Sequence, residues 1–368
     1  MPVAAPVGPG PRGPGPLPHS EPEAAPRVPI VVQYSGRVCL LGEHCDWAGG
    51  QSLTLPLPLS VRLAVEDLPA PHGPPLIRLR TAVHGELYDR SFPVDGAVDP
   101  EGGLLRYAPA AAAALAARGL HLRPCSVWVH ATLPAGRGFS SSAAFLLAVL
   151  DGLSRHAGHP LEPELLAELA YEVEHGLLGV PCGRLDPLAC AAGAPAYVRW
   201  RADGRGELRR IQPRLPLHLV VAVLPRPQPA APLLVALRAH RGDDLRAPAD
   251  PEGVKAVAEA LSTFADTAEA GAHALRTGDL RSLGAAMNRA QRAYEGAAQC
   301  VPALAAPRVS AAAARLRDEI NVLGVKFSGA GGDRSLVALC EDPEQSSATQ
   351  ALLEAAGMQA WPLVVERT

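Results

Sequence analysis

The segment PAGRGFSSSAA (residues 134–144) has the residue types of a turn that binds phosphate. Gly136 and Gly138 let the backbone approach a ligand closely, because glycine has no side chain in the way. The serines that follow supply hydroxyl and N–H groups, and the Ala- and Leu-rich run 141–153 predicts a helix that begins there. Since a helix N-terminus favours an anion, the chemistry indicated here is the binding of phosphate groups.

This segment differs from three other loops that bind nucleotides or activate a nucleophile. A dinucleotide-binding GxGxxG loop needs a third glycine where Ser141 stands, and it usually follows an apolar strand, whereas residues 126–133 alternate polar and apolar side chains. A nucleophile elbow, GxSxG, needs a closing glycine where Ser142 stands. A Walker A loop needs a lysine, but Lys255 and Lys326 lie far along the chain. The remaining alternative is an ordinary helix N-cap after a turn.

A second group of polar residues lies in the glycine-bracketed loop GEHCDWAGG (residues 42–50) and just before it. The group consists of Arg37, Glu43, His44 and Asp46. It places a guanidinium, two carboxylates and an imidazole close together in a loop between predicted strands. Loops held by rigid strands are where binding residues concentrate, so the group indicates a polar binding site. The alternative is a solvated turn with a helix cap.

Two further carboxylates lie between these motifs and the second half of the chain. Glu174 flanks the apolar stripe of a helix predicted over residues 161–178. A carboxylate at a buried edge usually has a cationic or metal partner, although an ordinary glutamate at the rim fits the same pattern. Asp186 precedes Pro187, which is also typical of a helix N-cap, so its alternative role is purely structural.

The pattern of apolar residues predicts the elements that position these groups. Residues 1–28 are rich in Pro, Gly and Ala without periodicity, which indicates a disordered leader. Strands are expected at 30–34, 38–41, 53–57, 61–65, 77–81, 126–133, 196–200, 217–224, 335–340 and 360–365, with a strand that runs into a glycine turn at 325–333. Helices are expected at 108–118, 141–153, 161–178, 251–274, 279–300, 309–323 and 343–356.

Composition excludes several classes of protein. The chain has 368 residues, 48% of them apolar, which allows one or two domains with a sizeable core. A net charge of −3 gives no basic surface for nucleic acid. The seven cysteines form no CxxC or Cys/His metal pattern, which indicates reduced thiols in a cytoplasmic protein. No apolar run approaches the roughly 18 residues of a membrane span, and the N-terminus has no apolar signal core.

Taken together, three segments resemble the motifs of the GHMP kinases, which include galactokinase, homoserine kinase, mevalonate kinase and phosphomevalonate kinase. Gly36-Arg37 with GEHCDWAGG resembles motif one in its galactokinase form, GR-x-NLIGEHTDYNGG. PAGRGFSSSAA resembles the phosphate-binding motif two, PxGxGLSSSA, and KFSGAGG (residues 326–332) resembles motif three, KxTGAGGGG. The three segments occur in the family's order, and the resemblance covers residues 29–368.

The resemblance implies an α+β protein with the two-domain GHMP kinase fold. Residues 29–205 would form an N-terminal, ATP-binding domain like domain 2 of ribosomal protein S5. Residues 206–368 would form a ferredoxin-like C-terminal domain. The resemblance also implies ATP and Mg²⁺ as cofactors, and Mg²⁺ takes hard oxygen ligands. The implied partners are ATP and a small molecule, with no nucleic acid and no membrane.

Roles carried over from the family fall on matching positions of this chain. Asp186, in CGRLDPLA, matches the aspartate beside the acceptor hydroxyl in galactokinases, and Arg37 matches the arginine that pairs with it. Ser142 and Glu174 match the Mg²⁺ ligands. The implied acceptor-binding residues are Glu43, His44, Asp46 and Gly183, and the implied ATP-binding residues are Pro134, Gly136, Arg137, Gly138, Ser140, Ser141, Ser142, Gly329 and Gly331.

The implied activity is that of an ATP- and Mg²⁺-dependent small-molecule kinase. Arg37 favours a sugar acceptor, because the mevalonate branch typically has lysine at that position. We expect phosphorylation of the anomeric hydroxyl of a monosaccharide, which could be galactose, a pentose or a uronic acid. The alternatives are a mevalonate-type kinase for a non-sugar alcohol, a catalytically silent ligand sensor and a dinucleotide-dependent oxidoreductase.

Three departures from the galactokinase pattern bear on the substrate. Cys45, Trp47 and Ala48 stand where galactokinases tend to have threonine, tyrosine and asparagine. The third motif continues as KFSGAGGDRSLVAL, which is similar to the glucuronokinase form. The segment after Leu224, PRPQPAAPLLVALRAHR, lacks the tyrosine of the galactokinase SEYxxRR region. These departures favour a sugar other than galactose as much as galactose itself.

Overall fold

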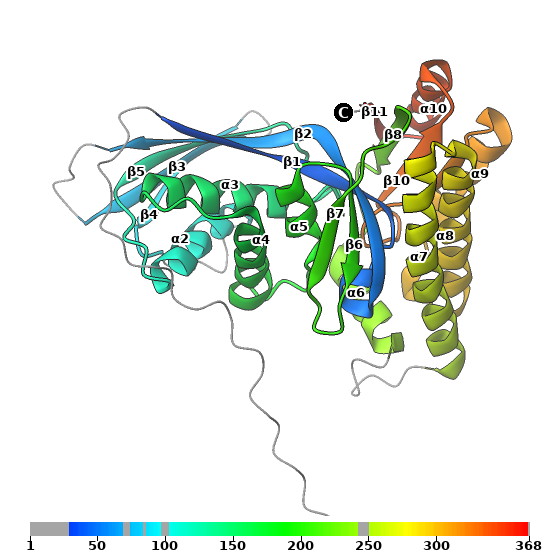
Figure 1. Ribbon diagram of the computed structural model, residues 1–368, viewed down its shortest axis with the longest axis horizontal. Coiled ribbons are helices and arrows are strands. Elements are labelled where there is room, and N and C mark those ends of the chain that lie inside the picture. The colour runs from blue at the N-terminus through cyan, green and yellow to red at the C-terminus, as the bar shows by residue number, and fades with distance from the viewer. Residues whose placement is uncertain (1–28, 69–73, 84–85, 97–102, 242–249, 367–368) are drawn as a thin grey trace, which may run out of the picture.

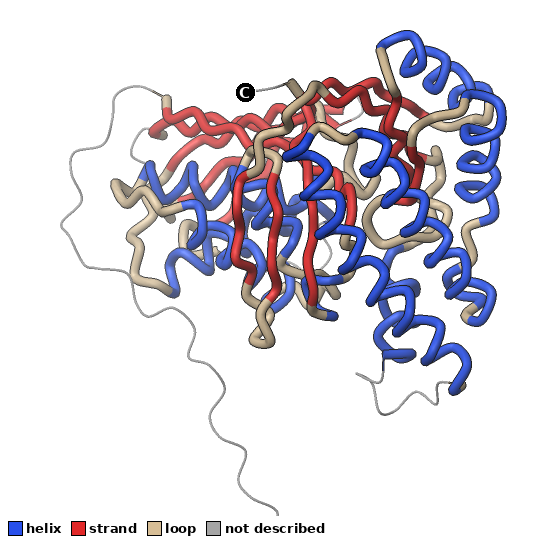
Figure 2. Tube along the Cα trace, turned by 45° about the vertical axis from the view of Figure 1, so that its right-hand side comes forward, coloured by secondary structure: helices blue, strands red, loops and turns tan. Residues whose placement is uncertain are grey.

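A computed structural model of the chain describes residues 29–68, 74–83, 86–96, 103–241 and 250–366. The leader predicted over residues 1–28 lies outside these described residues. The described chain forms two β-sheets, each covered by helices, and the sheets lie next to each other along the long axis of the molecule (Figure 1). Strands and helices form separate layers when the trace is turned (Figure 2).

The first sheet has seven strands and is built around its longest strand, β2. The strand order is β4-β3-β5-β2-β6-β7, and β1 pairs with β2 outside this path. β1 and β2 run antiparallel from Ile30 opposite Val65 to Leu41 opposite Leu53. The strands are β1 (Ile30–Leu41), β2 (Gly50–Asp67), β3 (Leu76–Val83), β4 (Glu86–Pro93), β5 (Cys125–Ala131), β6 (Ala196–Trp200) and β7 (Gly206–Arg210).

The two strand pairs predicted between residues 30 and 65 are in fact two continuous strands. A register shift between Ser35 and Arg37 lets β1 continue through Gly36, so this glycine bends the strand and does not end it. A Cβ at Gly36 would lie 2.6 Å from the carbonyl oxygen of Phe139. The missing side chain therefore allows β1 to pass directly against the glycine-rich turn.

Helices cover one face of the first sheet (Figure 1). They are α2 (Tyr107–Ala117), α3 (Ser141–His156), α4 (Pro163–Tyr171) and α5 (Leu185–Ala192). α3 lies against β1 and β2, and Gly152 allows this approach because a Cβ there would come within 2.6 Å of Leu63. The helix predicted over residues 161–178 is α4 followed by a π-helical turn, Glu172–Leu177, a feature that is frequent at functional sites.

The second sheet has four antiparallel strands in the order β11-β8-β10-β9. The strands are β8 (Leu217–Val223), β9 (Gly324–Phe327), β10 (Ser335–Cys340) and β11 (Gln359–Val365). The helices of this half are α6 (Ala230–Arg241), α7 (Pro251–Thr277), α8 (Leu280–Cys300), α9 (Pro307–Arg315) and α10 (Pro343–Ala355). The prediction contained neither α6 nor β4, and the helix predicted at 309–323 is α9 with a π-helical turn, Leu316–Ile320.

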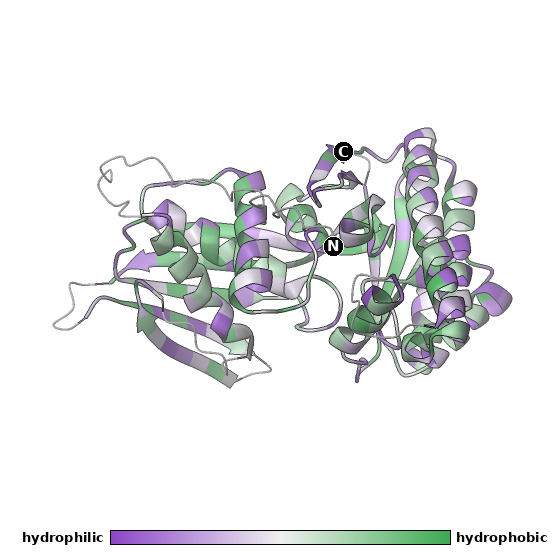
Figure 3. Cartoon of the chain, turned by 90° about the horizontal axis from the view of Figure 1, so that it is seen from below, coloured by the Kyte–Doolittle hydropathy of each residue, from purple (hydrophilic) through white to green (hydrophobic). Residues whose placement is uncertain are grey.

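The long helices α7 and α8 lie side by side (Figure 1), and each begins at an aspartate that caps it. The Asp250 side chain accepts from the Gly253 N–H, and the Asp279 side chain accepts from the Ser282 N–H. Hydrophobic and hydrophilic residues alternate around the helices of this half (Figure 3), which is typical of amphipathic helices packed on a sheet.

One hydrophobic core joins the two sheets. Leu41 and Leu53, at the end of the β1–β2 pair, pack against α7, where Gly271 leaves room for them. A Cβ at Gly271 would lie 2.3 Å from the Leu41 side chain. The domain boundary expected at 205/206 stays a proposal; strand β7, which follows it, pairs with β6 in the first sheet.

Candidate active site

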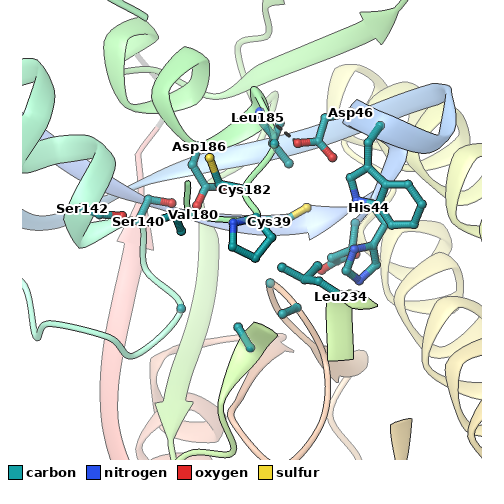
Figure 4. A pocket seen from close by; sticks show the side chains of 18 of the residues that line it. Cys39, His44, Asp46, Ser140, Ser142, Val180, Cys182, Leu185, Asp186 and Leu234 are labelled. Carbon is teal, nitrogen blue, oxygen red and sulfur yellow. Dashed lines mark hydrogen bonds between the residues drawn. The ribbon is translucent and has the colours of Figure 1, made fainter. Parts of the chain in front are cut away.

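A cavity of about 240 Å³ lies where the two sheets meet (Figure 4). Its walls come from the end of β1, the short helix α1 (Cys45–Ala48) with its loop, the turn between β5 and α3, the segment before α5, helix α6 and the turn after β9. The cavity therefore collects residues that are far apart in the sequence. Those predicted above are Arg37, Glu43, His44, Asp46, Gly136, Gly138, Ser140, Ser141, Ser142, Gly183, Asp186 and Gly329.

The turn between β5 and α3 has a left-handed backbone conformation at every second residue. The angle φ is +70° at Gly136, +88° at Gly138 and +59° at Ser140. This conformation is uncommon for a residue with a side chain, so the surrounding structure must hold Ser140 in place. A Cβ at Gly136 would meet nothing within 4 Å, so the turn is open beside the N-terminus of α3. Such a turn, with backbone N–H groups and a helix N-terminus, fits the phosphates of ATP.

Two arginines fasten this turn to the second half of the chain. Arg137 Nη1 donates to the carbonyl oxygen of Leu224 at 2.8 Å and also to that of Pro225. Arg334 Nη2 donates to the carbonyl oxygen of Gly136 at 3.4 Å. The turn is therefore positioned by both sheets and not by β5 and α3 alone.

Three of the residues expected to bind ATP do not line the cavity. Pro134 and Arg137 lie in the turn but outside the lining, and Arg137 is bonded to the backbone of the second half. Gly331 instead packs against Tyr294, since a Cβ at that glycine would lie 2.5 Å from the tyrosine ring. Direct contact of these three residues with ATP stays a proposal.

Arg37 and Asp186 form an ion pair in the wall of the cavity. Arg37 is 4% exposed, and its Nε donates to Asp186 Oδ1 at 3.0 Å, as does its Nη2. Arg37 Nη1 donates to the carbonyl oxygen of Gly138 at 3.1 Å, which ties the pair to the glycine-rich turn. The Asp186 side chain is 35% exposed, and no hydrogen bond from the described residues reaches its Oδ2. Oδ2 can therefore accept a hydrogen bond from a hydroxyl group in the cavity.

Asp186 does not cap the helix that it begins. α5 starts at Leu185 after an N-cap at Arg184, and no side-chain hydrogen bond caps it. Asp186 lies in the first turn of α5 and its carboxylate is bound by Arg37. The alternative prediction that Asp186 is a helix N-cap is therefore wrong, because its carboxylate pairs with Arg37 instead.

Glu43 and His44 line the cavity and have polar atoms without partners. Glu43 Oε1 accepts from Lys326 Nζ, and these two side chains are 1% and 0% exposed. Glu43 Oε2 and His44 Nε2 are buried, and neither has a hydrogen-bond partner within the described part of the chain. Burial, together with the charge of Lys326, lowers the pKa of His44 to about 4, so its imidazole is neutral at pH 7. Because buried polar groups normally have partners, these two atoms indicate a polar ligand such as a hydroxyl group.

Asp46 lies against the backbone of the segment before α5. Its Oδ2 accepts from the Leu185 N–H at 3.2 Å, and a Cβ at Gly183 would lie 1.6 Å from the same oxygen. Only glycine therefore allows this approach. Burial raises the pKa of Asp46 to about 6, the Leu185 N–H opposes the rise, and the charge of Asp186 adds to it. In Figure 4, Ser140 and Ser142 lie on one side of Asp186, and Asp46 and His44 lie on the other.

Glu174 lies in the π-helical turn after α4 and is 6% exposed. Tyr107 Oη donates to Glu174 Oε1 at 3.1 Å. Burial raises the pKa of Glu174 to about 6, and the nearby hydroxyl groups of Ser142 and Tyr107 oppose the rise in the pKa of this carboxylate. Ser142 and Glu174 together offer the hard oxygen atoms that suit Mg²⁺, which completes its ligands with phosphate oxygens and water. Glu172, two residues earlier, pairs with Arg118 instead.

The structure adds three side chains to the site that the sequence patterns did not single out. Tyr107 holds Glu174, Lys326 holds Glu43, and Arg238 on α6 lines the cavity. Of these, Lys326 had a visible signal, because it begins the third motif and is one of only two lysines in the chain. Tyr107 and Arg238 lie in stretches without a motif, and only the fold brings them to the cavity.

Two models of known families match separate segments of the chain. The model of the GHMP kinases N terminal domain matches residues 106–194, and that of the GHMP kinases C terminal domain matches residues 272–357. The galactokinase of Pyrococcus furiosus is 29% identical over 164 residues, which are 45% of this chain and 44% of that protein. The match thus spans less than half the length of this curated relative.

Solved structures with the same fold cover nearly the whole chain. Mevalonate kinase from L. major in complex with R-mevalonate aligns with a TM-score of 0.70 and 19% identity, covering 95% of this chain and 99% of that chain. Galactokinase from Lactococcus lactis complexed with galactose aligns with a TM-score of 0.70 and 19% identity, covering 92% and 93%. At these identities the likeness shows a shared fold. None of the described helices is long and apolar enough to cross a membrane.

Proposed function

We propose that this chain, which has the GHMP kinase fold and carries both domains of that family, is a phosphotransferase with an alcohol group as acceptor. It transfers the γ-phosphoryl group of ATP to the anomeric hydroxyl of a monosaccharide and releases a sugar 1-phosphate and ADP. The match to a galactokinase and the arginine at position 37 support a sugar as acceptor.

The observation that carries this proposal is the position of Asp186 within the cavity. On one side of it lie the serines at the N-terminus of α3, where the phosphates of ATP fit. On the other side lie His44 and Asp46, with the partnerless Nε2 of His44 and, nearby in the lining, the partnerless Oε2 of Glu43. A carboxylate between an anion-binding turn and a polar pocket is placed to act on the hydroxyl that receives the phosphoryl group.

In this proposal each residue has a defined task. Asp186 Oδ2 accepts the proton of the acceptor hydroxyl while the hydroxyl oxygen bonds to the γ-phosphorus and the bond from that phosphorus to the β-phosphate oxygen breaks. Arg37 holds Asp186 through Oδ1 and adds positive charge beside the transferring group. When bound, Mg²⁺ neutralises charge on the β- and γ-phosphate oxygens. Ser142 and Glu174 would hold it there.

Replacing Glu174 by glutamine is expected to raise the Mg²⁺ concentration that gives half-maximal rate, because the amide removes a charged oxygen ligand. We expect a shift of about 10-fold or more, as for other changes around a metal site. Ser142→Ala should shift the Mg²⁺ requirement in the same direction. Glu172→Gln is the matched control, since Glu172 pairs with Arg118. A Mg²⁺ titration at saturating ATP that is the same for Glu174→Gln and Glu172→Gln would contradict the assignment.

The acceptor KM is expected to rise as the pH falls through 6, because Asp46 has its pKa raised to about 6 and binds sugar hydroxyls as a carboxylate. Above that pH the group is ionised and the KM should be constant; one unit below it, the KM should be roughly tenfold higher. In Asp46→Asn the acceptor KM should be high and independent of pH. A wild-type acceptor KM that is flat from pH 8 to pH 5 would remove this role from Asp46.

The proposal is tested by measuring ADP release from ATP and Mg²⁺ across a panel of acceptors. The panel contains galactose, arabinose, glucuronate, galacturonate, other free sugars and mevalonate. Turnover with one free sugar supports the proposal. Turnover with mevalonate alone would place the protein among kinases for non-sugar alcohols. Binding of ATP and a sugar without turnover would make it a ligand sensor.

A further inference from the structure

Helix α6 forms one wall of the cavity, and its exposed face there ends in an arginine. Ala230, Leu234 and Arg238 all line the cavity, and their spacing of four residues places them on one face of the helix. Leu234 lies beside His44 in Figure 4, so Arg238 lies one turn farther along the wall that holds the polar pocket. The helix belongs to the segment over residues 225–241, in which this chain lacks the tyrosine of the galactokinase pattern.

The Arg238 guanidinium is fixed in place but has little hydrogen bonding. Its carbon lies 5.5 Å from the centroid of the Trp47 ring, on helix α1. One nitrogen, Nη2, donates to the carbonyl oxygen of Cys182 at 3.5 Å, the upper limit for such a bond. Arg241 holds Trp47 from the same helix, through a hydrogen bond to its carbonyl oxygen and a cation–π contact at 5.7 Å. Trp47 thus gives the Arg238 side chain a rigid support.

Arg238 makes fewer hydrogen bonds than the other arginines that line the cavity. Arg37 is paired with Asp186, and Arg334 donates to the carbonyl oxygens of Gln228 and Gly136. Arg238 makes no ion pair with any carboxylate in the described ranges of the chain, although it is half-buried. A guanidinium has five N–H donors, so most of those on Arg238 remain available to a molecule in the cavity.

The place of Arg238 is at the acceptor pocket. Its contacts are with Trp47 and Cys182, which flank Asp46 and Gly183 in the sequence, and its charge contributes to the lowered pKa of His44. Arg37 and Lys326 each have a carboxylate partner, Asp186 and Glu43. Arg334, the other cavity-lining arginine without a carboxylate partner, donates to the carbonyl oxygen of Gly136 and so lies at the glycine-rich turn. On the acceptor side of the described cavity wall, Arg238 is therefore the arginine that lacks a directly bonded carboxylate.

We infer that Arg238 binds an anionic group on the acceptor, and that the preferred acceptor is a sugar acid with a carboxylate. A guanidinium and a carboxylate match in a planar, bidentate arrangement that is stronger than a bond between neutral groups. One guanidinium offsets the single charge of a carboxylate, whereas a phosphate brings close to two charges beside Asp46 and Glu43. This inference rests on the proposed function and narrows its substrate class to uronic acids.

The test compares acceptors that differ only in the carboxylate, glucuronate with glucose and galacturonate with galactose, in wild type, Arg238→Gln and Arg238→Lys. In wild type the acid of one pair should have the higher kcat/KM. Arg238→Gln should lower kcat/KM for that acid by about 10- to 100-fold, since a bond to a charged group is lost. The same variant should change kcat/KM for the neutral sugar by less than about threefold. For the acid, kcat/KM of Arg238→Lys should lie between the values of wild type and Arg238→Gln. Arg281→Gln, at an exposed ion pair on α8, is the control.

The outcomes separate this inference from the proposed function. Turnover of sugars with no preference for the acid, or equal losses for acid and neutral sugar in Arg238→Gln, would overturn the role of Arg238 and leave the kinase proposal standing. A preference for the 6-phosphates of glucose and galactose over the uronates would overturn the assignment of a carboxylate as the anionic group that Arg238 binds. If no acceptor is turned over, binding of the uronates is measured by calorimetric titration in the presence of a non-hydrolysable ATP analogue. Binding that Arg238→Gln abolishes would support the role of Arg238 and overturn the kinase proposal. Absence of binding would overturn both.

Discussion

Asp186→Asn is expected to lower kcat by about 10²- to 10⁴-fold, the range that general base groups contribute, while the affinity for ATP stays close to that of wild type. The amide keeps the size of the carboxylate and can still accept from Arg37, but it cannot take up the proton of the acceptor hydroxyl. The rate is measured as ADP release at saturating ATP and acceptor. ATP affinity is measured separately with a non-hydrolysable analogue.

Asp151→Asn is the matched control for this variant. Asp151 likewise accepts from an arginine, Arg155, and also from the Tyr34 hydroxyl, but it is buried within α3 and does not line the cavity. Both substitutions remove a carboxylate from an ion pair, so a loss of stability should appear in both and a loss of turnover only in Asp186→Asn. Turnover of Asp186→Asn within about threefold of wild type would remove Asp186 from the mechanism.

Lys326→Met is expected to lower the free energy of unfolding by about 3–5 kcal/mol, because it leaves the buried carboxylate of Glu43 without its partner. Lys326 also donates to the carbonyl oxygen of Phe327, and this backbone group loses its bond as well. Burial already raises the pKa of Glu43, and the Lys326 ammonium opposes that rise, so its removal favours the protonated acid. The loss in the free energy of unfolding is measured by chemical denaturation of wild type and Lys326→Met at several temperatures.

The other lysine of the chain supplies the control. Lys255 forms an exposed ion pair with Glu259 on α7, with side chains 78% and 69% exposed, so Lys255→Met should cost only about 0–1 kcal/mol. In the double variant Lys326→Met/Glu43→Leu both charges are gone, and most of the lost stability should return. A loss in Lys326→Met as small as that of Lys255→Met would contradict the stabilising role assigned to the buried pair of Lys326 and Glu43.

Much of the fold follows from local patterns in the sequence. Helix α3 begins where the serines follow the glycine-rich turn, and α7 and α8 begin at the capping aspartates Asp250 and Asp279. The resemblance to the GHMP kinases, which rests on three short segments, is confirmed by the two family models and by the shared fold. Capping, turn formation and period-two alternation depend on neighbours in the chain, which explains why they could be predicted.

What could not be predicted depends on residues that are far apart in the chain. Glu43 and Lys326 are separated by 283 residues, and nothing in either segment shows that they meet. β1 continues through Gly36 because β2 pairs with it on both sides of the glycine, and the sequence of β1 alone suggests a break there. Helix α6 follows the segment PRPQP, which contains no Ser, Thr, Asp or Asn to cap a helix, and its arginine reaches the cavity only through the fold.

The sequence therefore predicted which residues form the candidate site more completely than it predicted the contacts between them. The motifs named the residues that line the cavity on both sides of Asp186. They did not predict that Arg137 bonds to the backbone of Leu224 or that Gly331 packs against Tyr294, because both contacts come from the second half of the chain. They also did not predict the hydrogen bond from Tyr107 to Glu174.

The most direct test of the central claim is to identify the product by ³¹P NMR after incubation with ATP, Mg²⁺ and the best acceptor of the panel. If Asp186 directs transfer to the anomeric hydroxyl, a new phosphate monoester whose phosphorus couples to the anomeric proton appears together with ADP, and no such signal appears with Asp186→Asn. A phosphate ester on another hydroxyl, or ADP with inorganic phosphate alone, would contradict this role of Asp186.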